Sequence, residues 1–116
     1  AAKCYQTLLE GSADAVGMTL PVVAPDNTSS WAQYTVQVGC RDQVQAALLQ
    51  GGVPTAVHYP SPIPMQPAML DSSGQYPVSA RSAQCVLSLP MHPYLDSATQ
   101  QCIAEQLIQV VKENTL

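Results

Sequence analysis

The sequence predicts an α+β fold in which one small sheet is covered by helices, and three observations support this class. The chain has 116 residues, 47% of them apolar, which suits one domain with a single core. Apolar periodicity gives four helical and three short strand-like segments, in the order helix, strand, helix, strand, long loop, helix, strand, helix. Only 10% of the residues are charged, against a usual share of about 25%, which excludes disorder driven by charge.

The expected elements of the first half follow one another closely. They are a helix over residues 1–10, a strand over 31–38, a helix over 41–50 and a strand over 53–59. Residues 18–23 are a candidate for an additional strand, which would lie at the sheet edge because Pro21 has no N–H for a central ladder. WAQYTVQV alternates so that Val36 and Val38 face inward. Gly51 and Gly52 end the second helix.

The second half begins with a proline-rich stretch, residues 59–76, which is followed by regular structure. The prolines exclude an interior strand or a helix, so we expect an extended segment that lies against a surface. Pro77 suits the first position of a helix over 77–85, and a strand over 86–90 follows. Asp96 is the expected N-cap of the last helix, with Ser97 as the alternative.

Charge and cysteine usage exclude several classes of protein. The net charge is −4, and the four cations are scattered, which argues against nucleic-acid binding. No apolar run reaches the roughly 20 residues of a membrane span, and the first residues do not resemble a signal peptide. The four cysteines lack a CxxC pair, so we expect reduced thiols in or near the core, with no metal site, in a cytoplasmic, reducing compartment. A disulfide or metal site is the alternative.

Motifs of local chemistry are absent. The glycines form no phosphate-binding loop, the eight acids are scattered, and no nucleophile elbow supports a hydrolase. The two histidines, His58 at a strand end and His92 in LPMHPYL, have no carboxylate nearby in sequence to orient them. These observations favour a binding or structural domain and predict no catalytic residue.

Two longer stretches are more specific. GGVPTAVHYPSPIPMQPA and GQYPVSARSAQCVLSLPMHPYL, together with SSWAQYTVQV and RDQVQAALLQGG upstream, cover about residues 19–111. They closely resemble the C-terminal region of the DegT–DnrJ–StrS family of sugar aminotransferases, which depend on pyridoxal phosphate (PLP). The resemblance implies the small C-terminal domain of the aspartate-aminotransferase fold. Residues 1–116 would be a single domain, with 1–10 the end of the inter-domain helix and 59–76 a substrate-side loop.

The resemblance also implies where function lies. In the family, PLP is held on a lysine of the large domain, and neither Lys3 nor Lys112 matches that motif. We therefore expect no cofactor site in this chain and no transamination by it alone. The HYP turn of the family faces the nucleotide-sugar substrate, so His58 and Tyr59 are the candidate substrate contacts, aimed by Pro60. The alternative is that these three residues only shape the loop, and for His92 we expect a structural role.

The implied partners leave alternatives open. A nucleotide sugar is the expected substrate, and a homodimer or a separate large-domain chain is the expected protein partner. The chain would then serve as one domain of an aminotransferase of amino-sugar or polysaccharide biosynthesis. A stand-alone binding or interaction module derived from that domain is the alternative function, and a fragment that folds without any ligand is a third.

Overall fold

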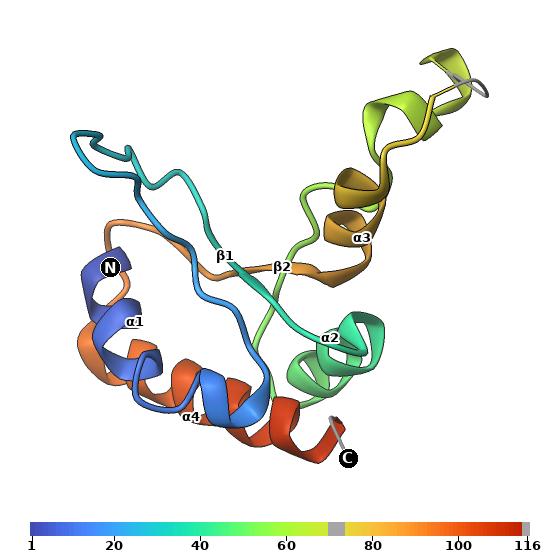
Figure 1. The fold of residues 1–116 in the computed structure, drawn as a ribbon. Coiled ribbons are helices and arrows are strands. Elements are labelled where there is room, and N and C mark those ends of the chain that lie inside the picture. Colours follow the sequence, from blue (N-terminus) through green and yellow to red (C-terminus); the bar gives the residue numbers. More distant parts are fainter. Residues whose placement is uncertain (70–73, 115–116) are drawn as a thin grey trace.

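The computed structural model describes residues 1–69 and 74–114, and within them the chain forms four α-helices and a small sheet (Figure 1). The helices are α1 (Ala2–Leu9), α2 (Arg41–Gln50), α3 (Pro77–Cys85) and α4 (Ser97–Asn114). The strands are β1 (Tyr34–Gln37) and β2 (Val86–Leu89), and the short 3-10 helices are η1 (Asp14–Val16), η2 (Ile63–Met65) and η3 (Pro67–Met69). The predicted α+β class is confirmed.

The sheet is antiparallel and smaller than predicted. β1 pairs with β2 in the register Tyr34↔Leu89 to Gln37↔Val86. The strands expected over 18–23 and 53–59 are each reduced to one bridging residue, Thr19 beside β1 and Ala56 beside β2. Both predictions of a strand were wrong because prolines interrupt these segments: Pro21 in one, Pro54 and Pro60 around the other.

Helices α1, α2 and α4 bury the core. Helix α4 packs against both α1 and α2, and these three helices lie together on one side of the sheet (Figure 1). The largest fully buried side chains come from all of these elements: Tyr5, Leu9, Tyr34, Val36, Leu48, Leu87 and Leu107. Buried Gln100 of α4 donates from Nε2 to the Ala1 carbonyl at 3.0 Å, which ties the first residue to the last helix. These three helices form the helical base of the molecule. The proline-rich segment lies away from this base (Figure 1).

The proline-rich segment forms an arm with α3 that extends away from the helical base (Figure 1). It is not extended throughout as predicted, because η2 and η3 make single turns closed by Met65 N to Pro62 O and Met69 N to Gln66 O, both 2.9 Å. A single 3-10 turn requires only one hydrogen bond, from the N–H of one residue to the carbonyl three residues before it. Proline, which has no N–H, is therefore tolerated at the other positions of the turn. Residues 70–73, the rest of the predicted loop before Gly74, lie outside the described residues.

The cysteines correct another expectation. All four are free, but Cys40 and Cys102 are exposed, and Cys4 and Cys85 are only partly buried. Cys40 has a positive φ of 47° in the turn before α2, and this turn leaves its side chain outside the core. Across the described ranges, no three His, Cys, Asp or Glu side chains gather where a metal ion could bind. None of the described helices has the length and apolarity needed to cross a membrane.

Candidate functional site

The predicted site residues lie where the chain leaves the sheet for the arm. His58 is two residues beyond the bridge between Ala56 and Ser88, and its side chain is partly buried. Tyr59 follows through a cis peptide bond and is 70% exposed. The two rings meet edge to face, with their centroids 5.6 Å apart. The structure thus brings His58 and Tyr59 together at the root of the arm.

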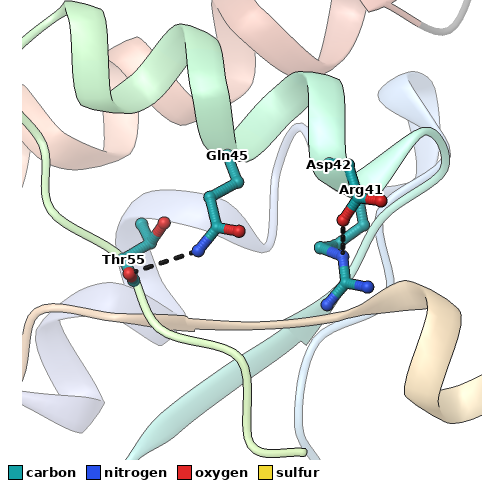
Figure 2. Close-up of polar contacts among 4 residues, drawn as sticks. All are labelled: Arg41, Asp42, Gln45 and Thr55. Atoms are coloured by element: carbon teal, nitrogen blue, oxygen red, sulfur yellow. Dashed lines mark hydrogen bonds and ion pairs between the residues drawn. The ribbon is translucent and has the colours of Figure 1, made fainter. Parts of the chain in front are cut away.

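Backbone bonds and one glutamine hold the segment that leads to this turn. Ser88 N donates to Ala56 O at 2.8 Å, and Ala56 N donates back to Ser88 O at 3.1 Å. From α2, Gln45 Nε2 donates to the Thr55 carbonyl at 3.3 Å, and Figure 2 shows the glutamine reaching across from the helix. The segment before His58 is therefore tied on one side to β2 and on the other to α2.

A chain of polar side chains begins in the sheet and ends at His58. Thr35 of β1 and Ser88 of β2 are register partners, and their hydroxyl oxygens are 2.8 Å apart. Ser88 Oγ is also 3.2 Å from His58 Nδ1. Sequence reasoning missed both hydroxyl residues. The available signal was a serine inside the apolar run VLSL, since a polar side chain buried in a strand needs a specific partner.

Two concave sites flank His58. One, of about 300 Å³, lies between the arm and α3 and is lined by His58, Tyr59, Ser61, Pro62, Ile63, Gln66, Val78, Ser79, Ser82, Ala83 and Val86. The other, of about 360 Å³, lies along β2 and is lined by Ala32, Gln33, Pro54, Thr55, Ala56, His58, Ser88, Leu89, Pro90 and Met91. Of these described lining residues, His58 alone borders both cavities.

The lining of both cavities is uncharged and mixes apolar with polar side chains. Hydroxyls, amides and one imidazole supply the polar atoms, and the described residues contribute no carboxylate, lysine or arginine to either lining. Such a surface suits a ligand that is oriented by hydrogen bonds and covered by apolar side chains. Although Ser88 Oγ and His58 form a hydroxyl–imidazole pair, the serine is only 4% exposed, so its oxygen is not accessible as a nucleophile.

The other residues singled out in the sequence lie elsewhere. His92 is exposed in the turn before α4, and its carbonyl accepts a hydrogen bond from Leu95 N at 3.2 Å. Lys3 on α1 and Lys112 on α4 are both exposed. Neither lysine lines the two cavities beside His58.

The fold and site together define a small α+β domain, a helix-backed sheet whose edge carries an uncharged concave surface. Residues 1–108 match the DegT/DnrJ/EryC1/StrS aminotransferase family. The chain therefore belongs to that family, which confirms the resemblance found in the sequence.

Individual relatives agree with this assignment. A UDP-2-acetamido-2-deoxy-3-oxo-D-glucuronate aminotransferase of Pseudomonas aeruginosa is 49% identical over 92 residues, which are 79% of this chain and 26% of the relative. The crystal structure of S. venezuelae DesV in complex with a ketimine intermediate is 32% identical with a TM-score of 0.75, over 98% of this chain and 30% of that one. The structure of ntda from Bacillus subtilis with bound cofactor PMP is 28% identical with a TM-score of 0.78, over 96% and 27%.

The matches cover nearly all of this chain but only part of each relative. The chain spans about a quarter of the length of the curated relatives it matches, 26%, 26% and 24% for three of them. It nevertheless superposes on solved family members over almost its whole length. The predicted fold, the small domain of this type of aminotransferase, is therefore confirmed, although its sheet has fewer strands than expected.

Proposed function

We propose that this chain forms the substrate-side wall of a nucleotide-sugar aminotransferase of amino-sugar or polysaccharide biosynthesis. The observation that carries the proposal is the HYP turn, which places His58 beside two neutral cavities at the edge of the sheet and Tyr59 beside one of them. The 49% identical relative from Pseudomonas aeruginosa is named for a UDP-sugar substrate, which supports the same substrate class here.

The two side chains suit different parts of such a ligand. Half-buried His58 can donate a hydrogen bond to a phosphate or sugar oxygen, and such oxygens are acceptors. Tyr59 presents an exposed ring that can stack on a base or a sugar, or donate through its hydroxyl. The apolar lining of the cavity between the arm and α3 would cover the ligand, and the serine hydroxyls there would bind sugar hydroxyls.

In this proposal the PLP cofactor is bound by residues outside this domain. PLP chemistry requires a lysine amine in a partly desolvated site and an acidic partner for the pyridine nitrogen. The described residues do not fit that group, because Lys3 and Lys112 are both exposed and sit on helices away from the cavities beside His58. We propose that residues 1–116 form one domain, with 1–10 ending an inter-domain helix, and that this domain works with a PLP-bearing one in the cytoplasm.

A protein partner is proposed on the same grounds. The arm and α3 expose several large apolar side chains: Tyr59, Ile63, Met65, Met69, Tyr76 and Val78. Their clustering on one projecting unit is typical of a surface that another protein covers. We propose a second copy of this chain as the occupant, and a separate large-domain chain is the alternative outcome.

Ligand binding tests the function directly. Titration of the chain with UDP-N-acetylglucosamine, followed by NMR of the histidine ring signals, should perturb His58 and leave His92 unchanged. His58→Ala should weaken binding about ten-fold, since a hydrogen bond to a charged group is lost. His92→Ala is the matched control, because it removes the other imidazole of the chain from an exposed turn. Equal affinity of His58→Ala and the unaltered chain would contradict the assignment.

A further inference from the structure

We propose that Ser88, with Thr35 behind it, is a positioning residue that holds His58 in the tautomer with the proton on Nε2. The serine would fix the imidazole as a hydrogen-bond donor toward the ligand. The proposal rests on the proposed function only for the identity of that ligand, a nucleotide sugar. The state of the imidazole itself is a property of the free chain.

Ser88 fixes the position of His58 through both its backbone and its side chain. Its backbone pairs with Ala56, two residues before His58, and its hydroxyl oxygen lies 3.2 Å from His58 Nδ1. Ser88 is 4% exposed and belongs to β2, so its hydroxyl is held by the sheet and not by a mobile loop. The ring nitrogen nearest the sheet is thereby engaged, and Nε2 is the nitrogen left for a ligand.

The number of hydroxyl protons on Thr35 and Ser88 indicates which group donates in each hydrogen bond of the Thr35–Ser88–His58 chain. Each hydroxyl has one proton to donate. If Thr35 donates to Ser88 and Ser88 donates to Nδ1, both protons are used within the protein. In the reverse direction Nδ1–H donates to Ser88 and Ser88 to Thr35, and no described protein acceptor receives the Thr35 proton. Thr35 is half-buried, so the reverse direction would leave its proton to solvent, whereas the first direction pairs both hydroxyl protons within the protein. The first direction is therefore favoured, and it leaves the ring proton on Nε2.

This direction fits the chemistry of the proposed ligand. Diphosphate and ring oxygens of a nucleotide sugar accept hydrogen bonds and cannot donate them. An imidazole with its proton on Nδ1 would present a lone pair to those oxygens and would repel them. If the free chain already holds the Nε2–H tautomer, no binding free energy is spent on converting the imidazole to that tautomer when the ligand binds.

The ¹⁵N shifts of the histidine rings test the proposal, because they distinguish the two neutral tautomers. They are recorded on the free chain while the pH is raised until they no longer change, and His58→Gln assigns the signals. We expect the Nε2–H form to dominate in the unaltered chain. Ser88→Ala should give a mixed population and weaken UDP-N-acetylglucosamine about five-fold, as expected for one lost hydrogen bond. Ser88→Thr, which keeps the hydroxyl, should restore both properties.

Two further variants keep the test decisive. Thr35→Val removes the other described acceptor of the Ser88 proton, so Ser88 can then donate only to Nδ1 and the Nε2–H form should stay dominant, which keeps the proposal testable if Ser88→Ala does not fold. Thr19→Val is the matched control, because Thr19 is exposed beside β1 and lines neither cavity next to His58, so its loss should change neither the tautomer nor the affinity. A mixed population in the unaltered chain, a population unmoved by Ser88→Ala, or a shift toward Nδ1–H in Thr35→Val overturns the proposal. If Ser88→Ala shifts the tautomer but no nucleotide sugar binds, the positioning stands and the proposed function fails.

Discussion

At the scale of single residues, Arg41 is the most unusual side chain of the fold. It opens α2, yet its side chain is only 9% exposed, and its Nη1 atom is buried without a hydrogen-bond partner among the described residues. Its counter-charge is Asp42, 86% exposed, with Oδ1 2.7 Å from Arg41 Nε (Figure 2). One accessible carboxylate therefore balances a desolvated guanidinium, an arrangement in which burial of the charge offsets much of the attraction.

The energetic cost of this pair can be measured with a double-mutant cycle. Asp42→Ala should lower the free energy of unfolding by about 1–2 kcal/mol, because it leaves the buried guanidinium without a counter-charge. Arg41→Met keeps the apolar stem and should be neutral or stabilising. The Asp42 carboxylate also interacts favourably with the positive N-terminal end of α2. That contribution is present with either residue at position 41, so it cancels when the cycle is used to calculate the coupling energy. Urea unfolding of the four proteins measures the coupling, and an equal cost of Asp42→Ala in the Arg41→Met background would show that the pair is not coupled.

Residue-level prediction from sequence was uneven for a physical reason. His58 and Tyr59 were singled out as candidates because the HYP motif is contiguous. Ser88 was not, since its contact with His58 spans 30 positions and exists only once the Ala56 bridge has formed. Arg41 was missed as well, because charged residues are ordinarily exposed, and its burial at the start of α2 depends on tertiary packing that the sequence does not show.

At the scale of elements, helices were predicted better than strands. The signals at helix ends are local: α3 begins at Pro77, and Asp96 caps α4 by accepting from Thr99 N at 2.8 Å. That bond and a second one from the Thr99 hydroxyl hold the pKa of Asp96 below its usual range. Strands depend on a partner that sequence does not show, so alternation over 31–38 identified β1, whereas two segments expected to be strands form single bridges.

The arm allows a prediction at the same scale, because the chain offers two matched exposed residues. Ile63 in η2 is 64% exposed, and Leu49 in α2, off the arm, is 65% exposed. If the arm pairs with a second copy, Ile63→Ser should weaken the dimer about ten-fold, since an apolar side chain loses its burial in each copy. Leu49→Ser removes the same kind of exposed side chain and should leave the dimer unchanged. Light scattering over a concentration series measures this, and a monomer at every concentration would contradict the homodimer.

At the scale of the whole molecule, two buried tyrosines join parts of the chain that are far apart in sequence. Tyr5 of α1 donates from its hydroxyl to the Pro90 carbonyl at 2.9 Å, which links the first helix to the end of β2. Tyr34 of β1 donates to Gln6 Oε1 at 2.9 Å. The centroids of the Tyr5 and Tyr34 rings are 5.2 Å apart. Trp31, which precedes β1, stacks on Tyr34. Together they fasten α1 to the sheet.

These tyrosines should make the fold sensitive to alkali. Burial raises the pKa of each to about 12, with smaller contributions from the charges of Cys4 on Tyr5 and of Glu10 on Tyr34. An unfolded chain releases such protons near pH 10, whereas the folded chain keeps them to about pH 12. Between these values the unfolded state binds fewer protons, so the free energy of unfolding must fall as the pH rises. The stabilisation is complete below about pH 10 and is lost as the pH passes about 12.

Phenylalanine variants test this dependence. Tyr5→Phe and Tyr34→Phe should each cost about 1 kcal/mol at neutral pH through the lost hydrogen bond. Both should flatten the decline above about pH 10, because the variant ring has no proton to release. Tyr94→Phe is the control, since that side chain is 90% exposed and its loss should alter neither the neutral stability nor the slope. Urea unfolding from about pH 8 to about pH 11.5 covers the window. A slope equally steep in Tyr5→Phe, Tyr34→Phe and the unaltered chain would assign the alkaline instability to other groups.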